Sequence, residues 1–148
     1  MLTKTLETIF HRDLDALKQE IEAYQNEDRL WMVTKDISNS AGNLCLHIIG
    51  NLNHFIGAVL GHTGYARQRE LEFTRTHVPK IEMITNIEAT KAIVAKVLAD
   101  LTTTDLEREY ELKVFNKPMS TGYFLVHLST HLAYHLGQIN YHRRLLDS

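Results

Sequence analysis

Apolar residues recur at intervals of three and four along four separate stretches of the chain. This spacing places them on one face of an α-helix, so each stretch predicts an amphipathic helix. The four predicted helices cover residues 2–24, 41–60, 79–101 and 120–146. Ser38-Asn39-Ser40 marks the start of the second, because such side chains accept the unpaired N–H groups of a first turn. Pro79 suits the first turn of the third, where no backbone N–H is needed.

The connections between these helices are longer than a minimal bundle needs. Residues 25–37 and 62–78 are polar and poorly periodic and predict loops, the second with a short turn. Residues 105–116 alternate loosely between apolar and polar side chains, which favours an extended segment. Four helices without a strong strand predict an all-α fold, a four-helix bundle formed as a single domain over residues 1–148. We expect at least one connection to cross an end of the bundle.

The composition argues against several classes of partner. Net charge is −2 with neutral histidines and the basic residues form no stripe, so we expect no binding to nucleic acid or to an anionic membrane. No apolar run approaches the roughly 18 residues of a membrane span, and we recognise no signal peptide. The single cysteine, Cys45, lies in an apolar run and predicts a buried structural thiol. The lack of a disulfide framework is typical of a cytoplasmic protein.

Histidines are the candidate chemistry of this chain. His127, His131 and His135 follow one another at intervals of four on the last predicted helix. Side chains four apart lie on one helix face about 6 Å from each other, so two imidazoles can reach one ion. Because the row slants around the helix, only two of the three can converge. The apolar centre of this helix lies around Leu132, which favours His131 and His135 as the inward pair and leaves His127 at the rim.

A third ligand would come from a facing helix. The second predicted helix offers His47 and His54, with Asn51 between them on the same narrow stripe. Three neutral imidazoles leave coordination positions open for water or substrate, as in catalytic sites, and they suit zinc, nickel or iron. The residues alone leave the choice between His47 and His54 open, and histidines packed in the core or ligating haem are alternatives. The lone histidines, such as His11 and His142, are expected to be solvated or hydrogen-bonded boundary residues.

Two well-known metal sites do not fit. The helix of zinc proteases carries a glutamate directly after its first histidine, but Leu128 follows His127 and Leu132 follows His131. Di-iron carboxylate bundles need Glu-x-x-His on two helices, and this sequence contains no such motif.

The histidine motifs resemble those of a known group, the DinB-like (YfiT-like) superfamily. Residues 39–52, around His47, resemble the superfamily's motif on its second helix, and residues 127–139 resemble its closing motif. Between them, residues 67–73 match the Arg-x-Arg-x-x-Glu-Phe stretch of one branch. The resemblance covers nearly the whole chain. It implies a four-helix bundle with up-down-down-up order and a long crossover loop.

The resemblance also implies a ligand set and a range of activities. Carried onto this sequence, the superfamily's divalent-metal ligands are His47, His131 and His135. Characterised members include S-transferases and isomerases that depend on bacillithiol, mycothiol or glutathione, and members are often homodimers. We therefore expect a metal-dependent thiol S-transferase acting on small electrophiles, with a low-molecular-weight thiol as cosubstrate and Asn51, Tyr134 and Gln138 as polar residues that orient ligands.

Two other hypotheses use the same metal. A non-catalytic metal-binding protein of stress-response type would hold the ion without turnover. A metal-dependent hydrolase would need a general base, for which Glu70 or Glu72 could reach in from the second loop.

Overall fold

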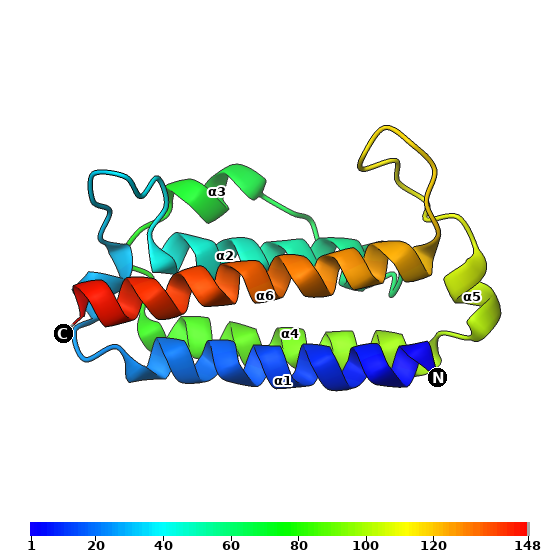
Figure 1. The fold of residues 1–148 in the computed structure, drawn as a ribbon, viewed down its shortest axis with the longest axis horizontal. Coiled ribbons are helices and arrows are strands. Elements are labelled where there is room, and N and C mark those ends of the chain that lie inside the picture. Colours follow the sequence, from blue (N-terminus) through cyan, green and yellow to red (C-terminus); the bar gives the residue numbers. More distant parts are fainter. Residues whose placement is uncertain (148) are drawn as a thin grey trace.

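The computed structural model describes residues 1–147, and its regular elements are helices, with no strand among these residues (Figure 1). The long helices are α1 (Leu2–Ala23), α2 (Ala41–Leu52), α4 (Lys80–Asp100) and α6 (Thr121–Leu146). The short ones are the 3₁₀-helix η1 (Glu27–Trp31), the π-helix η2 (Asn53–Ala58), α3 (Arg69–Thr74) and α5 (Thr103–Glu107). No helix within the described part of the chain is long and apolar enough to cross a membrane.

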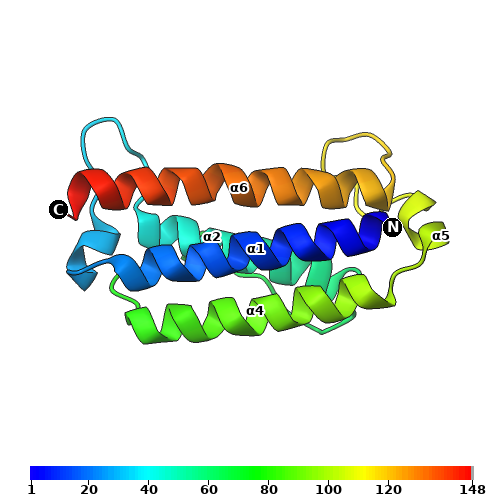
Figure 2. The same cartoon turned by 60° about the horizontal axis from the view of Figure 1, so that its bottom comes forward.

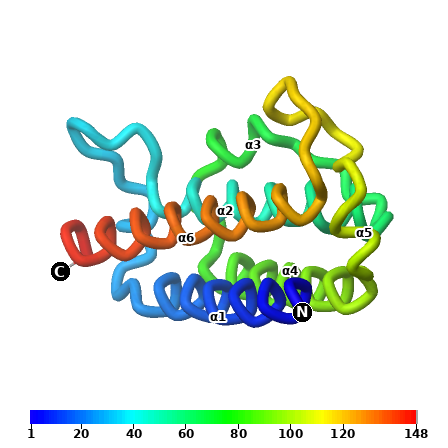
Figure 3. Tube along the Cα trace, turned by 45° about the vertical axis from the view of Figure 1, so that its right-hand side comes forward, coloured from blue at the N-terminus to red at the C-terminus, as the bar shows by residue number. Residues whose placement is uncertain are grey.

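The four long helices lie side by side (Figures 1 and 2). α1 packs against α4 and α6, and α2 packs against α6 and α4. α1 and α6 run in one direction along the molecule, and α2 and α4 run in the opposite direction. Because α2 and α4 are parallel, the chain between them returns along the length of the molecule and carries α3 over the outside of α2 (Figure 3). This segment, residues 59–79, includes α3 and is the longest connection between consecutive long helices.

Regular burial of one helix face forms the core. On α1 the predicted apolar stripe is buried, with Phe10, Leu14 and Leu17 at most 1% exposed. Met83, Ile87 and Leu98 of α4 face the same interior and are completely buried. Each such side chain contributes about 1.5–3 kcal/mol relative to an exposed one. Cys45 lies in this core as expected, completely buried.

Side-chain caps fix where the two site helices begin. The Ser40 hydroxyl accepts a hydrogen bond from the Asn43 backbone N–H at 3.1 Å, and the Ser120 hydroxyl accepts one from the Tyr123 N–H at 3.1 Å. Both caps satisfy donors that a first turn leaves unpaired. The predicted start of the last helix and its end at Leu146 are confirmed.

The second predicted helix is helical as far as Ala58, but its type changes after Leu52, which the sequence did not predict. There the backbone changes to a π-helix, in which the Val59 N–H bonds to the His54 carbonyl five residues earlier. The Asn53 amide Nδ2 donates to the Ile49 carbonyl at 2.8 Å and to the Thr90 hydroxyl at 2.9 Å. Asn53 therefore links this change of helix type to α4, and such bulges are frequent at functional sites.

The connections also differ from prediction. The expected extended segment 105–116 begins instead inside α5, which a capping box between Thr102 and Asp105 starts. Its only pairing within residues 1–147 is one isolated antiparallel bridge, Glu109 to Ser120. The two predicted loops contain η1 and α3.

His142 was expected at a boundary but lies in the interior. It is 4% exposed, and its ring nitrogens contact the Tyr24 hydroxyl at 2.7 Å and the Met32 carbonyl at 2.9 Å. It therefore ties the end of α6 to the chain that follows α1.

Candidate metal centre

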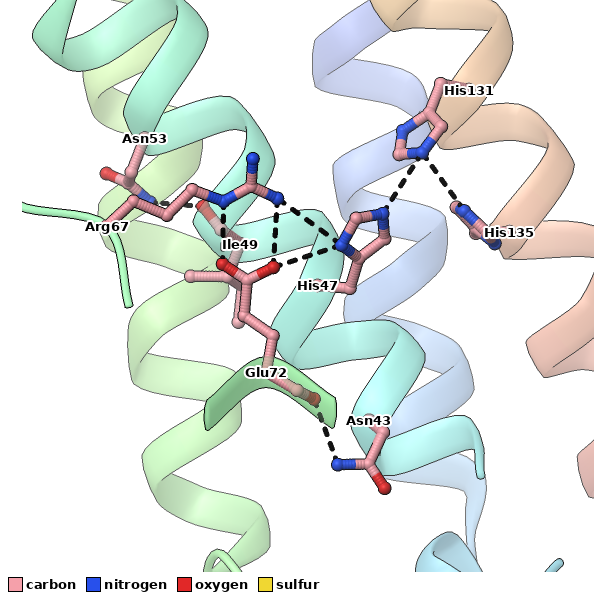
Figure 4. Close-up of polar contacts among 8 residues, drawn as sticks. All are labelled: Asn43, His47, Ile49, Asn53, Arg67, Glu72, His131 and His135. Atoms are coloured by element: carbon pink, nitrogen blue, oxygen red, sulfur yellow. Dashed lines mark hydrogen bonds and ion pairs between the residues drawn. The ribbon is translucent and has the colours of Figure 1, made fainter. Parts of the chain in front are cut away.

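Three imidazole nitrogens converge between α2 and α6 (Figure 4). The Nε2 atom of His131 lies 3.2 Å from Nε2 of His47 and 3.1 Å from Nε2 of His135. One ligand atom from each of the three histidines lies within 4.8 Å of the others. Nitrogen ligands about 2.1 Å from a zinc ion lie roughly 3.0 Å apart at octahedral angles and roughly 3.4 Å apart at tetrahedral angles. The spacing around His131 therefore fits a single small cation.

Burial keeps two of these rings neutral. The pKa of His131 is lowered to about 4, first by burial and then by the neighbouring His135 and His47 rings. Burial also lowers the pKa of His135, against the opposing effect of its hydrogen bond to Gln138. A metal ligand must be a neutral imidazole. At neutral pH the site therefore offers lone pairs without first having to lose protons from these two rings.

Hydrogen bonds at the other ring nitrogens set the tautomers. Nδ1 of His47 lies 3.0 Å from a carboxylate oxygen of Glu72, and Nδ1 of His135 lies 2.7 Å from the amide oxygen of Gln138. These oxygens accept, so in each ring Nδ1 carries the hydrogen and Nε2 keeps its lone pair. This arrangement, in which the outer nitrogen donates to a carboxylate or carbonyl, is the usual support of a metal-binding histidine.

Glu72 is itself held firmly. The Nε and one Nη of Arg67 each donate to its carboxylate at 2.9 Å, and Asn43 Nδ2 donates to its backbone carbonyl at 2.9 Å. Burial alone would raise the pKa of Glu72, but the hydrogen bonds from His47 and Arg67 hold it below its usual value. Glu72 is therefore ionised at neutral pH and fixed as the acceptor for His47.

Gly50 makes room for this carboxylate. A Cβ atom at position 50 would overlap the Glu72 carboxylate, which lies directly against the α2 backbone. The absence of a side chain thus lets α3 approach α2 closely enough for Glu72 to reach His47, one turn earlier on α2.

The structure places the sequence-predicted histidines as follows. It brings His47, His131 and His135 together, whereas His54 lies in the π-helix with its ring against Phe55, outside this group. His127 lies at the rim: its ring centroid is 6.5 Å from that of His131.

The three predicted orienting residues have different surroundings. Gln138 contacts His135. Asn51 is 6% exposed and its Oδ1 has no hydrogen-bond partner among the described residues. Tyr134 is 66% exposed, and its ring centroid lies 5.4 Å from that of His135. Sequence reasoning named Glu72 only as a general base and gave Arg67 no role, although both belong to the matched Arg-x-Arg-x-x-Glu-Phe stretch.

Two cavities flank the histidine group. One, of about 320 Å³, lies beside His135 and Gln138 and includes Tyr141; we call it the Tyr141 cavity. The other, of about 310 Å³, lies beside His47 and His131. We call it the aromatic cavity; its further lining includes Asn51, Phe55, Arg67, Phe115, Phe124 and His127. Small molecules can therefore approach the three histidines from two sides.

The fold and the site define an all-helical protein with three histidines close enough together to be able to hold a metal ion. The sequence matches the family described as "Protein of unknown function (DUF1572)" over residues 4–148, and the chain belongs to this family. No curated protein matches the chain significantly.

Proposed function

We propose that this protein binds one divalent metal ion through Nε2 of His47, His131 and His135. The observation that carries the proposal is the convergence of these three nitrogens, with His131 Nε2 3.1–3.2 Å from the other two. Glu72 and Gln138 support it, because each holds the outer nitrogen of one ring in the tautomer that metal binding needs. Zinc, nickel and iron all suit three imidazoles.

We further propose that the chain is a DinB-like four-helix bundle with up-down-down-up order, forming a single domain. The directions of the four long helices and the crossover that carries α3 support this assignment. So do the positions of the histidines, since all three fall on the superfamily's ligand positions. Cytoplasmic location and a homodimer are further parts of the same assignment.

The reaction we propose is thiol S-transfer. The sulfur of a low-molecular-weight thiol forms a bond to the carbon of a small epoxide or halide. The thiol proton passes to the opened epoxide oxygen or leaves with the halide as acid. A divalent ion held by three imidazoles would lower the pKa of a thiol or water bound to it. The protein's part is to hold the two reactants, and its two cavities on opposite sides of the histidines suit a reaction with two substrates.

The surroundings of Glu70 and Glu72 support a metal-dependent hydrolase less well than a thiol transferase. Glu72 already accepts hydrogen bonds from His47 and Arg67, so its carboxylate is occupied. Glu70 is exposed on α3, and its backbone carbonyl bonds to Thr74. Neither residue is arranged to take a proton from water.

Elemental analysis tests the metal proposal. Untagged wild-type protein is compared with His131→Ala and with His11→Ala, a control on the exposed part of α1. We expect close to one zinc, nickel or iron per chain in wild type and control, and loss of the metal in His131→Ala. No stoichiometric metal, and none taken up from added zinc or nickel, would disprove the proposed site.

A second assay separates an enzyme from a non-catalytic metal-binding protein. Loaded protein is mixed with bacillithiol, mycothiol or glutathione and an epoxide or halide, and consumption of the electrophile is followed. Thiol-dependent turnover that His131→Ala abolishes supports the transferase. Bound metal without turnover for any of the three thiols favours the non-catalytic alternative.

A further inference from the structure

The aromatic cavity changes in character along its length. At one end, Nε2 of His47 on α2 meets Nε2 of His131 on α6 at 3.2 Å. At the other end, the rings of Phe55 and Phe124 pack edge to face with centroids 5.1 Å apart. α2 and α6 are packed together and run in opposite directions, so residues later in the chain on α2 lie beside residues earlier in the chain on α6 (Figure 1). Eight residues of helix separate the two ends by about 12 Å, so one small molecule can touch both.

A polar position lies between these ends. Asn51 is one turn beyond His47 on α2, and His127 is one turn before His131 on α6; both line the cavity. Asn51 is 6% exposed, yet its Oδ1 has no hydrogen-bond partner among residues 1–147. A buried acceptor without a partner is unfavourable and rare in folded proteins. A ligand with an O–H or N–H group in the cavity would satisfy it.

Aromatic side chains form the apolar end of the aromatic cavity. Phe115, from the chain between α5 and α6, packs 6.2 Å from Phe124 and 4.8 Å from the His127 ring. The His127 ring lies nearly parallel to Phe124, with 13° between their planes. Phe124 is 1% exposed and enclosed by these rings, whereas Phe55 is half-buried and Phe115 is 38% exposed. The ring surface that a ligand can reach is therefore that of Phe55 and Phe115. The Tyr110 hydroxyl donates to the Phe55 carbonyl at 2.6 Å and so fastens this connection to the π-helix.

The side wall selects against positive charge. Arg67 and Arg69 line the cavity, and no aspartate or glutamate does so among the described residues. The guanidinium of Arg67 lies 5.6 Å above the Phe55 ring and is paired with Glu72. Arg69 is exposed, with its guanidinium 5.3 Å above Phe73. Because Glu72 balances the charge of Arg67, the positive charge at the mouth of the cavity is that of Arg69, which favours an anion over a cation there.

We propose that the aromatic cavity binds a small aryl acid with a hydroxyl group between its ring and its acid group. The ring lies among Phe55, Phe115 and Phe124, and the hydroxyl donates to Oδ1 of Asn51. The acid group lies toward Arg69 and toward the end of the cavity formed by His47 and His131. A ligand of this class carries no leaving group, so it is not the electrophile of the proposed transfer. The proposal goes beyond the proposed function and concerns binding in the aromatic cavity alone.

Binding of unreactive probes tests the cavity directly. Isothermal titration uses the full chain, both as purified and after removal of metal with a chelator. Mandelate carries the ring, the hydroxyl and the charge. Lactate lacks the ring, phenylacetate lacks the hydroxyl, and 2-amino-1-phenylethanol replaces the negative charge with a positive one. We expect mandelate to bind about tenfold or more tightly than lactate and about fivefold more tightly than phenylacetate, with the amine weakest.

Variants identify the contacts. Asn51→Leu, which keeps the volume and removes the amide, should abolish the advantage of mandelate over phenylacetate. Phe115→Ala, on an exposed connection, should weaken mandelate about fivefold and leave lactate unchanged. Tyr141→Ala, in the other cavity, is the matched control and should leave all probes unchanged.

The outcomes separate this proposal from the metal proposal. Ring-dependent binding that persists in metal-free protein supports the cavity, whatever the elemental analysis finds. If no probe binds saturably in the millimolar range to either form, the cavity proposal is overturned. It is also overturned if Tyr141→Ala weakens mandelate while Phe115→Ala and Asn51→Leu do not.

Discussion

An oxygen of the Glu72 carboxylate lies 3.0 Å from Nδ1 of His47, although 25 residues of chain separate the two (Figure 4). The contact forms because α3, only six residues long, is held against α2 by Asn43, whose Nδ2 donates to the carbonyls of Glu72 and Arg75. The crossover between α2 and α4 therefore does more than connect two parallel helices. It supplies the residue that orients one of the three histidines.

Replacing this carboxylate should weaken metal binding without removing a ligand. In Glu72→Gln, Nδ1 of His47 loses its charged acceptor, and we expect zinc affinity to fall about 10–100-fold. Competition with a chromophoric chelator measures it. Glu70→Gln, on the exposed side of α3, is the control and should match wild type. Unchanged affinity in Glu72→Gln would show that His47 is oriented by packing alone.

Adding one methyl group at position 50 should have a similar effect. Alanine there would force the Glu72 carboxylate away from α2, because its Cβ overlaps that group. Gly137→Ala is a matched control on α6, since a Cβ there meets nothing within 4 Å. The control should gain about 0.5–1 kcal/mol in free energy of unfolding. Thermal unfolding with and without zinc measures both effects. We expect Gly50→Ala to lose most of the stabilisation by zinc, and a full zinc effect in this variant would contradict the account.

The metal-free protein should become less stable in mild acid because of His131. Its pKa is lowered to about 4 in the folded protein, whereas the ordinary value is 6.5. Between these two values the unfolded chain binds more protons at this residue, so the free energy of unfolding falls as pH falls through that window. Below about pH 4 the protonation of His131 causes no further change in the free energy of unfolding. Urea unfolding of wild type and His131→Ala across this range gives the difference; parallel curves would contradict the prediction.

Cys45 should not react with thiol reagents in the folded protein. The side chain is completely buried, and burial raises the pKa of its thiol to about 12. A disulfide reagent should modify it only after denaturant unfolds the chain. Fast modification of native protein would show that α2 opens locally. An inert Cys45 also means that the thiol of the proposed reaction comes from a cosubstrate.

The sequence predicted those parts of the fold that short-range patterns determine. The apolar stripe of α1 and both ends of α6 follow from residue spacing and from the cap at Ser120. The π-helix does not, because Asn53 bonds to Thr90, which is 37 residues away. The short α5 was overlooked, although Thr102 and Asp105 have the spacing of a capping box.

The same contrast between short-range and long-range information applies to the residues of the candidate site. Four-residue spacing together with the apolar centre of the helix around Leu132 identified His131 and His135 as the inward pair. Pairing them with His47 rather than His54 depended on family resemblance, because spacing within α2 does not reveal its register against α6. The role of Glu72 was missed because its contact with His47 depends on the fold of the crossover.

The pairing of Arg67 with Glu72 has a consequence for the overall charge of the site. Their opposite charges cancel across two hydrogen bonds of 2.9 Å, and three neutral imidazoles add no negative charge. A divalent ion bound there would thus keep its double positive charge in a partly buried position, where charge is poorly screened. Neutrality can then be reached only through the remaining ligands. Such a centre should prefer thiolate, hydroxide or carboxylate over neutral donors.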